Sequence, residues 1–517
     1  MPAPPPTRPS LPKTRVQPIA EETATPFRRL VVASSFLPVH LSRTGPSAPW
    51  EARTTIGGLV TALRAVLTSR GGVWVGWTGA TAETGAPEGE LSTETAGQDA
   101  YDLRAVSLTA REEREFYCGF CNQVLWPLFH GLPDHSLIEP PYWPSYQRAN
   151  RKFAEEIAAA HTDGDLVWVH DYQLLMVGDE LARLGVSRGV SFFLHTPFPP
   201  PELFFRLPWA ERLLTALSCY DLIGFQTDRH MANFLACVRR LDPEPAFHSG
   251  HPSLGVEATL GGERRRFRVG SFPTGIDYYA LAAEAESDEV EALTETLRQR
   301  LGGRRMLLGI DRLDYTKGVR HKLKAFANLL DTHPEWRGQV VLLQVVIPSR
   351  ETIPAYAALK QEIDGLVGEI NGLYSRPGWI PIQYHYRRVT ETELLAFYRA
   401  ADGAVIVPLE DGMNLVAKEY CAANVQESGV LVLSRFAGAA AQLADGALLV
   451  NPWDEVDLAE TLHRALTMSP EERRDHMAAL RAVVRNEDIY HWAGSFLKAA
   501  VRAQGGEAES LSLPFSH

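Results

Sequence analysis

Two cations, Arg312 and Lys317, stand five residues apart directly after an apolar run of the sequence. That run, "RMLLGID" (305–311), has the length of a strand buried on both faces, so the cations follow its carboxyl end. A planar guanidinium fits phosphate oxygens and a lysine adds a point charge, which together suit an anionic ligand. A surface pair neutralised by Asp311 and Asp314 explains the same residues, and this stretch alone favours neither interpretation.

A second anion-binding pattern follows another apolar run, "GAVIVPL" (403–409). The run leads into a turn with Asp411 and Gly412, and "NLVAKEYCAA" has the composition of a helix that begins near Asn414. The first N–H groups of a helix are unpaired and attract phosphate. Glu419, further into the helix, suits a ribose diol, although a solvated glutamate on an ordinary capped helix is the alternative. Together the two patterns favour a nucleotide diphosphate.

Histidines end two apolar runs in the N-terminal half. "LVWVHDY" (166–172) contains His170 and Asp171, and "GVSFFLH" (189–195) ends in His195. A single histidine after a strand is more often structural than catalytic. Because ligands of open α/β sheets bind beyond the carboxyl ends of the strands, these side chains are expected to face a cleft between the two halves.

The elements that position these residues alternate between short apolar runs and segments of helical periodicity, which predicts βαβ units and doubly wound parallel sheets. The strands expected in the N-terminal half are 29–34, 72–77, 166–172, 189–195 and 221–227. Those expected in the C-terminal half are 305–311, 339–347, 382–389, 403–409, 430–434 and 447–451. Two such series predict an α/β protein of two Rossmann-like domains facing across a cleft, with a boundary near 271–277.

Composition excludes several classes of protein. The chain has 517 residues, 45% of them hydrophobic and 22% charged, and a formal net charge of −12, which argues against a general nucleic-acid binder. No stretch has the length of a membrane-spanning helix. Five cysteines fit a reducing cytosol better than a disulfide framework. Cys118 and Cys121 have CxxC spacing but no second ligand pair, so they are interpreted as packing residues and no metal site is expected.

Taken together, the motifs resemble those of the trehalose-6-phosphate synthases, retaining glycosyltransferases of family 20 with the two-domain GT-B fold. The similarity covers about residues 28–500 and is carried, in the family's order, by "GGL", "VLWPLFH", "HDYQLL", "FFLHTPFP", "DLIGFQT", "DRLDYTKG", "PSRE", "DGMNLVAKEY" and "SRFAGAA". With it, the expected organisation is a disordered Pro-rich arm (1–27), an N-terminal acceptor domain (28–275), a C-terminal nucleotide-sugar domain (276–485), a helix returning to the N-terminal domain (486–502) and a disordered tail (503–517).

The resemblance implies transfer of glucose from a nucleotide sugar, UDP-glucose first, to glucose 6-phosphate, giving trehalose 6-phosphate. It implies no cofactor or metal, a cytoplasmic location and a homo-oligomer, dimer or tetramer. The same-face mechanism that it implies passes the acceptor's proton to a leaving phosphate oxygen. The implied catalytic residues are Asp171, His195, Arg312 and Lys317. The implied donor-binding residues are Gly58, His195, Arg312, Lys317, Asp411, Gly412, Met413, Asn414, Leu415, Val416 and Glu419. The implied acceptor-binding residues are Tyr117, Trp126, Asp171 and Arg350.

The chain departs from the family pattern at two positions. Phe36, in "VVASSFLPV", stands where an arginine that contacts the acceptor phosphate is expected, and Arg43 is the nearest arginine that follows in the sequence. Glu410 replaces another arginine beside the donor turn. The change at Phe36 keeps open a different acceptor, such as glycerol 3-phosphate or a cyclitol. A catalytically silent sugar-phosphate sensor is a further alternative, disfavoured because the diphosphate-binding residues are present.

Overall fold

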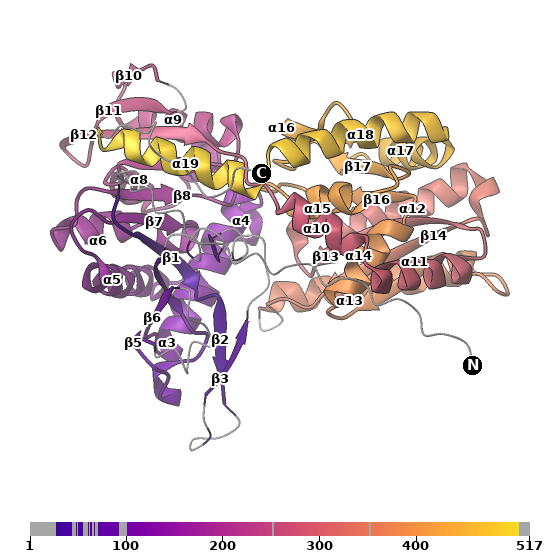
Figure 1. Cartoon of the computed structure of the whole chain (residues 1–517), viewed down its shortest axis with the longest axis horizontal. Helices are drawn as coiled ribbons and strands as arrows, with labels where there is room; N and C mark the ends of the chain where they lie inside the picture. The colour runs from indigo at the N-terminus through magenta and orange to yellow at the C-terminus, as the bar shows by residue number, and fades with distance from the viewer. Residues whose placement is uncertain are drawn as a thin grey trace, which may run out of the picture.

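The computed structural model describes residues 27–505 except for 44–47, 49, 55–59, 61–62, 65–66, 68–70, 92–100, 251–252 and 351–352. Nearly all of the Pro-rich arm and of the tail expected from the sequence lies outside the described residues. Two sheets stand side by side along the long axis of the molecule, each flanked by helices (Figure 1). This confirms the predicted α/β architecture, while the expected domain limits remain a prediction.

The N-terminal sheet has ten strands in the order β10-β11-β12-β9-β8-β7-β1-β4-β6-β5. Its strands are β1 (Leu30–Phe36), β4 (Gly72–Trp77), β5 (Gly89–Glu90), β6 (Asp102–Val106), β7 (Leu166–His170), β8 (Val190–Phe193), β9 (Leu222–Phe225), β10 (Ala246–His248), β11 (Leu254–Leu260) and β12 (Glu263–Ser271). The central strands pair in parallel, whereas β10, β11 and β5 pair antiparallel at the edges. A separate hairpin joins β2 (Val39–Ser42) and β3 (Glu51–Thr54).

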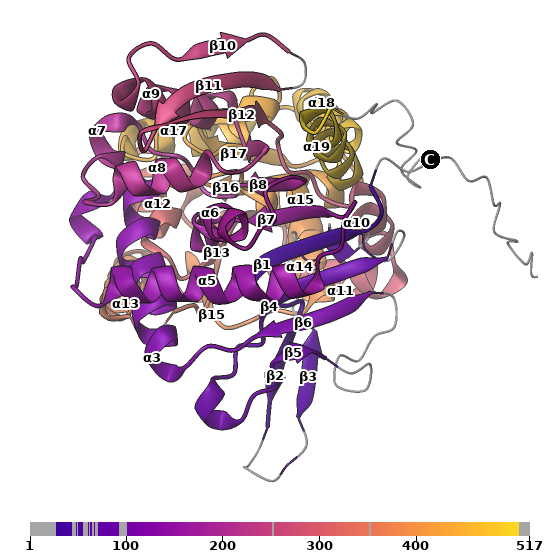
Figure 2. The same cartoon turned by 90° about the vertical axis from the view of Figure 1, so that its left-hand side faces the viewer.

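Helices cover both sides of the N-terminal sheet, and Figure 2 shows α5, α6 and α8 in front of it. The helical segments of this half are α3 (Ala110–Glu112), the π-helical η2 (Glu113–Leu125), α4 (Trp126–Phe129), α5 (Tyr142–Ala160), α6 (Val177–Arg183), α7 (Pro201–Phe204), α8 (Ala210–Leu217) and α9 (Asp228–Leu241), with short 3-10 turns at η1 (Ala82–Thr84), η3 (Pro133–His135) and η4 (Tyr172–Leu174). The π-helical stretch has no counterpart among the sequence expectations, and such stretches are frequent at functional sites.

The C-terminal sheet has six parallel strands in the order β15-β14-β13-β16-β17-β18. They are β13 (Arg305–Arg312), β14 (Val340–Ile347), β15 (Ile382–Tyr386), β16 (Gly403–Ile406), β17 (Val430–Ser434) and β18 (Leu448–Val450). The helices of this half are α10 (Tyr278–Ala285), α11 (Asp288–Leu301), α12 (Val319–Thr332), α13 (Pro354–Tyr374), α14 (Glu391–Ala400), α15 (Leu415–Ala423), α16 (Ala440–Leu443), α17 (Glu455–Thr467) and α18 (Pro470–Asn486), with 3-10 turns at η5 (Tyr315–Lys317) and η6 (Pro334–Trp336).

The last described helix, α19 (Ile489–Ala503), crosses back and packs on the N-terminal sheet (Figure 1). Its Trp492 and Phe496 rings lie 5.1 Å and 4.5 Å from the Trp168 ring, centroid to centroid. The Ile489 N–H donates to the Ile276 carbonyl at 2.9 Å, so the two chain segments that join the halves run against each other. Over the part of the chain that the structure describes, no helix combines the length and apolarity that crossing a membrane requires.

Candidate active site

Arg312 and Lys317 emerge at the carboxyl end of β13, but their surroundings differ. The Lys317 Nζ atom lies 2.6 Å from Asp411 Oδ2. Arg312 is exposed and makes no ion pair with any described residue; its guanidinium lies 5.7 Å from the centroid of the Trp126 ring. Asp311, which the sequence offered as a surface partner, is held instead by the buried ammonium of Lys322 at 2.6 Å. Arg312 is therefore a cation left available for an anion.

Asp314, the other carboxylate offered as a partner, organises the loop between the two cations. It is 1% exposed and caps the turn η5 by accepting from the Thr316 N–H at 3.0 Å. It also accepts from Trp126 Nε1 at 3.4 Å and lies 3.7 Å from an Arg350 nitrogen. Burial raises its pKa, but Arg350, Arg312 and Lys317 outweigh burial and hold it below the ordinary value.

Helix α15 begins where the sequence predicted. Asn414 is its N-cap, in a left-handed conformation with φ of 80°, and its side chain accepts from the Ala417 N–H at 3.2 Å. The Asn414 amide also donates to Asp411 Oδ2 at 3.1 Å, so one carboxylate joins the helix cap to Lys317. Although burial opposes it, the Lys317 ammonium lowers the pKa of Asp411.

Leu415 and Val416 form the first turn of α15, and Glu419 lies further along the helix. The Glu419 carboxylate is not simply solvated, because its Oε2 accepts from the Tyr398 hydroxyl at 2.9 Å. Burial raises the pKa of Glu419, which the Tyr398 hydrogen bond partly offsets. A carboxylate held in this way keeps a second oxygen for a hydroxyl donor.

The turn before α15 touches the N-terminal half through Gly412. A β-carbon at Gly412 would lie 1.9 Å from the His195 carbonyl oxygen, so no larger residue fits there. Met413, which follows, is buried at 4% exposure. Backbone from both halves therefore meets at this turn.

His195 and Asp171 lie on the N-terminal side of that contact, as the sequence predicted. The His195 N–H donates to Asp171 Oδ1 at 3.2 Å, and His195 Nε2 lies 3.1 Å from His170 Nδ1. Desolvation lowers the pKa of His195 to about 3, so its ring is neutral at pH 7. Burial raises the pKa of Asp171 to about 6, against hydrogen bonds from three backbone N–H groups and the charge of Arg350.

Among the residues that the structure describes, Asp171 is also one of four that have a positive φ and are not glycine, at 74°. Such a conformation is costly outside glycine and persists where the surrounding structure fixes it. The neighbouring strand β8 supplies that constraint, because the Asp171 N–H donates to the Phe193 carbonyl at 2.8 Å.

The predicted acceptor residues Trp126 and Arg350 are brought together. The Arg350 guanidinium lies 4.2 Å from the Trp126 ring centroid, and it donates to the hydroxyls of Tyr356 at 2.8 Å and Tyr172 at 3.4 Å. Arg350 also has a left-handed backbone, with φ of 50°. Trp126 thus has Arg350 at 4.2 Å and Arg312 at 5.7 Å from its ring.

Phe36, the departure at the end of β1, places an aromatic ring beside Tyr117 in place of a charge. Its ring lies 5.0 Å from Trp77 and 5.1 Å, edge to face, from Tyr117. Arg43 does not replace the missing cation, because it donates to the Thr84 carbonyl and lies over the Trp50 ring at 4.6 Å.

The charge of Glu410, the second departure from the family pattern, is neutralised by residues of the N-terminal half. It forms an ion pair with Arg229 of α9, and His230 Nε2 lies 3.9 Å away. The negative charge beside the donor turn is therefore matched by a cation of the N-terminal half.

Asp314 was expected only as a surface partner of the two cations, and two residues near the site, Gln226 beside His195 and Lys418 on α15, were not singled out from the sequence. Each stands inside a quoted motif, "DRLDYTKG", "DLIGFQT" or "DGMNLVAKEY", so the motifs themselves were the available signal. Gly58, predicted to contact the donor, lies outside the described residues.

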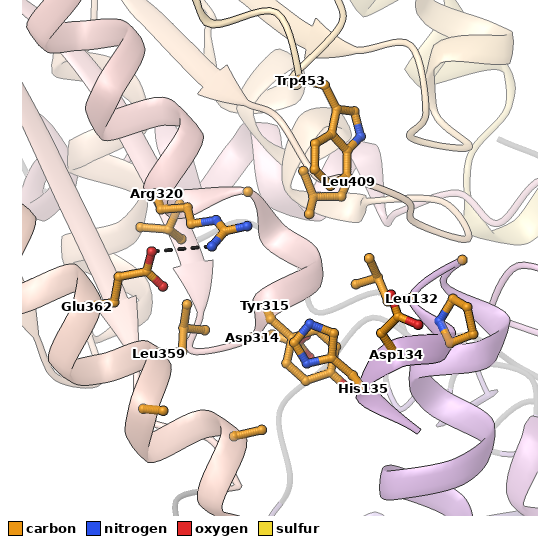
Figure 3. Close-up of a pocket in the computed structure, with 16 residues that line it drawn as sticks. Leu132, Asp134, His135, Asp314, Tyr315, Arg320, Leu359, Glu362, Leu409 and Trp453 are labelled. Carbon is orange, nitrogen blue, oxygen red and sulfur yellow. Dashed lines mark hydrogen bonds and ion pairs between the residues drawn. The ribbon is translucent and has the colours of Figure 1, made fainter. Parts of the chain in front are cut away.

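A cavity of about 360 Å³ lies behind the loop that carries Asp314 (Figure 3). His135 from the N-terminal half stacks on Tyr315 at 4.6 Å, and Arg320 pairs with Glu362 on its wall. None of the predicted site residues that the structure describes lines it, so the cavity and the candidate site are separate spaces that share the Asp314 loop.

A group of possible metal ligands, His333, Glu335 and His463, lies on the C-terminal half, away from these residues. The two imidazole rings are stacked 3.7 Å apart and nearly parallel, at 9°. Lone pairs in the planes of parallel stacked rings do not converge on one point, so this arrangement does not hold a common ion.

Two α/β sheets side by side, with an available arginine and a helix N-terminus at the carboxyl edge of one, and with Trp126 of the other half against Arg350, have the arrangement of a glycosyltransferase of the GT-B type. The family model described as Glycosyltransferase family 20 matches residues 28–502. The chain belongs to this family.

The relatives include the trehalose-6-phosphate synthase of Mycobacterium sp. (strain JLS), which is 40% identical over 91% of this chain and 95% of its own. The bifunctional trehalose-6-phosphate synthase/phosphatase of Thermoproteus tenax is 39% identical, and this chain spans 64% of its length. Among solved structures, an E. coli protein bound with UDP-2-fluoro glucose matches with a TM-score of 0.82 at 35% identity, over 92% of this chain and 99% of that one. A UDP-forming synthase from Burkholderia xenovorans in complex with glucose-6-phosphate matches with a TM-score of 0.81 at 32% identity, over 91% and 99%.

Proposed function

We propose that the protein transfers glucose from UDP-glucose to glucose 6-phosphate with retention, giving trehalose 6-phosphate. The proposal is carried by the position of two guanidinium groups beside the Trp126 ring, that of Arg350 at 4.2 Å and that of Arg312 at 5.7 Å from the ring centroid. Two arginines, each able to bind phosphate, lie near one indole, which suits a reaction in which the donor and the acceptor each carry phosphate. The relatives solved with UDP-2-fluoro glucose and with glucose-6-phosphate support the choice of substrates.

The donor would lie against the C-terminal half. Arg312 and Lys317 would bind the diphosphate. Lys317 would give up its ion pair with Asp411 and bind phosphate oxygens instead.

The N-terminus of α15 would add to donor binding. The N–H groups at Asn414, Leu415 and Val416 would add hydrogen bonds and the positive end of the α15 dipole. Further along the helix, the free oxygen of Glu419 would accept from the ribose.

The glucosyl unit would lie over the turn that meets the N-terminal half. Asp411, released from Lys317, and the backbone of Gly412 and Met413 would bind its hydroxyls. His195 closes the opposite wall. The acceptor would then approach from the Asp171 side, with its phosphate at Arg350 and Tyr117.

Catalysis in this scheme is electrostatic. Arg312 and Lys317 stabilise the negative charge that develops on the departing UDP, and fixed charges in a site that excludes water act more strongly than in solvent. The glucosyl–phosphate bond breaks, the acceptor hydroxyl oxygen bonds to the anomeric carbon from the same face, and its proton passes to a phosphate oxygen of UDP. Asp171 positions the acceptor in this scheme.

A second candidate acceptor follows from Phe36. The aromatic cluster of Phe36, Trp77 and Tyr117 supplies no positive charge where the family pattern has arginine, and one charged hydrogen bond contributes about 1.5–3 kcal/mol to binding. An acceptor other than glucose 6-phosphate, such as glycerol 3-phosphate or a cyclitol, is the alternative that this observation favours.

We also propose a cytosolic location and a homo-oligomeric state. All five cysteines are free thiols, which suits a reducing compartment, and the family resemblance supports self-association.

The deciding experiment measures UDP release from UDP-glucose with glucose 6-phosphate, glucose, glycerol 3-phosphate or a cyclitol as acceptor. We expect release that depends on glucose 6-phosphate, with a non-reducing disaccharide phosphate as product. Turnover with another acceptor alone would replace the proposal by the second candidate. Absence of turnover with every acceptor and with UDP-, GDP- and ADP-glucose would reject both.

A further inference from the structure

A chain of hydrogen bonds joins the donor helix α15 to His195 through the segment that links the two halves. Lys418 Nζ donates to the Thr274 carbonyl at 2.7 Å, and the Thr274 N–H donates to Gln226 Oε1 at 2.9 Å. Gln226 Nε2 lies 3.4 Å from His195 Nδ1, and His195 Nε2 lies 3.1 Å from His170 Nδ1. The chain thus crosses from one half of the molecule to the other.

The direction of each bond follows from the backbone. Because the Thr274 N–H is a donor, the Gln226 atom that faces it must be the carbonyl oxygen, and the amide NH₂ then faces His195. An NH₂ group only donates, so His195 Nδ1 must be the unprotonated nitrogen. The proton of the neutral ring therefore sits on Nε2 and is donated to His170.

Because the groups are buried, the loss of any of these hydrogen bonds is costly. Thr274 and Gln226 are each 2% exposed and Lys418 is 1% exposed, so water does not replace a lost partner cheaply. Desolvation lowers the pKa of Lys418 to about 7, with Glu487 opposing it. The amine keeps N–H donors in either protonation state, so the bond to Thr274 persists.

His195 is the residue at which this chain of bonds reaches the substrates. Its backbone N–H donates to Asp171, and its carbonyl oxygen touches the Gly412 turn. Lys418, at the other end, is adjacent to Glu419 on α15. A movement of His195 that includes its backbone therefore displaces both the Asp171 side and the Gly412 side of the site.

We propose that Gln226 is a positioning residue that holds His195 as its Nε2-protonated tautomer, and that Lys418 fixes Gln226 from the donor helix through Thr274. The consequence for glucosyl transfer rests on the function proposed above. The tautomer itself is a property of the protein without substrate, so the two are tested separately.

The test uses ¹⁵N-histidine-labelled full-length protein, with the His195 signals identified by their loss in His195→Gln. We expect a protonated Nε2 and an unprotonated Nδ1 between about pH 5.5 and 8.5, because a pKa near 3 lies well below this range.

The variant Gln226→Glu is expected to reverse the tautomer. Its carboxylate still accepts from the Thr274 N–H but now also accepts from His195, so Nδ1 acquires a proton. The matched control Gln123→Glu makes the same change where the side chain bonds the Cys118 carbonyl and Tyr142, and it leaves the His195 signals unchanged.

The kinetic arm separates positioning from binding. We expect Gln226→Glu to lower kcat for transfer about 10- to 100-fold while the UDP-glucose dissociation constant changes by less than about threefold. Lys418→Met keeps the tautomer and lowers kcat about tenfold, since Thr274 is no longer held.

Two results would overturn the inference. One is a His195 Nδ1 that stays unprotonated in Gln226→Glu, and the other is a reversed His195 tautomer with unchanged kcat. Failure of all transfer by the unmodified protein, with the tautomer as expected, refutes the proposed function instead.

Discussion

At the scale of single residues, the site is defined by which charges are already compensated. Lys317 has Asp411, and Arg350 has Asp314 and donates to two tyrosine hydroxyls. Arg312 has no carboxylate partner among the described residues, although two aspartates flank it in sequence. Its charge is therefore reserved for a ligand.

Replacement of this arginine, Arg312→Gln, is expected to weaken UDP binding about 10- to 100-fold, which corresponds to about 1.5–3 kcal/mol for one charged hydrogen bond. The melting temperature should fall only slightly, because no ion pair within the described chain is lost and only a longer-range attraction to Asp314 is removed. Calorimetric titration with UDP and a thermal melt measure the two effects. Arg320→Gln, which breaks only the ion pair with Glu362, is the matched control and should leave UDP affinity intact. Equal losses in both variants would contradict the assignment.

The raised pKa of Asp171 predicts a pH-dependent stability. Its folded-state pKa of about 6 lies above the value of an unfolded aspartate, so the native state resists ionisation and loses stability as pH rises from about 4 to about 6. Asp171→Asn does not ionise, so it should be more stable than the unmodified protein above about pH 6. That advantage should vanish below about pH 4. Thermal melts from pH 4 to 8 measure it, whereas rates are less suitable because a sugar phosphate itself titrates near pH 6. A constant difference at every pH would show that the pKa is not raised.

At the scale of elements, the chemistry sits where strands end and tight backbone turns follow. The parallel order of the C-terminal sheet brings the end of β13 beside the turn after β16, although about a hundred residues separate them in sequence. The alternation of apolar and helical segments was sufficient to predict this, because the strands that carry the site are central and buried on both faces.

The edges of the N-terminal sheet were less predictable. Strands β10, β11 and β12 pair antiparallel there, and none of them was among the expected strands, because edge strands alternate polar and apolar residues and resemble loops in composition. The π-helical stretch Glu113–Leu125, which carries Tyr117, was not anticipated either. Its hydrogen-bond register depends on packing that periodicity does not reveal.

The turn at Gly412 gives the prediction at this scale. In Gly412→Ala the new methyl group would overlap the His195 carbonyl oxygen, so the turn must move and transfer should fall by about 100-fold or more. Gly365→Ala, inside α13 with open space around its position, is the control and should stabilise the protein by about 0.5–1 kcal/mol. Turnover and urea unfolding distinguish the two. Normal turnover in Gly412→Ala would show that the contact with His195 is not kept during the reaction.

At the scale of the whole molecule, the two halves are joined by specific side-chain contacts. The hydrogen bonds through Gln226 and the ion pair between Arg229 and Glu410 connect them on the site's side. The residue types of the site were predictable from the sequence because they stand in ordered motifs. These contacts were not, because Arg229 and Glu410 are 181 positions apart and pair only once both halves are folded.

The ion pair predicts a charge-dependent response. Glu410→Arg restores the family's residue but places it against Arg229, so like charges oppose closure of the cleft and kcat/KM should fall several-fold, more at low salt than at high salt. The double variant Arg229→Glu with Glu410→Arg restores opposite charges and should recover most of the loss. Steady-state kinetics at two ionic strengths measure this. Loss in the single variant without recovery in the double one would mean that Glu410 acts on the donor turn directly.

The most direct test of the account is a crystal structure of the protein with UDP and glucose 6-phosphate. We expect the diphosphate at Arg312 and Lys317, with Lys317 moved off Asp411, and the acceptor phosphate hydrogen-bonded to Arg350 and the Tyr117 hydroxyl beside Phe36. An acceptor phosphate bound elsewhere, or a diphosphate that leaves Arg312 untouched, would contradict the central claim that Arg312 and Arg350, the two cations beside Trp126, bind the phosphates of the two substrates.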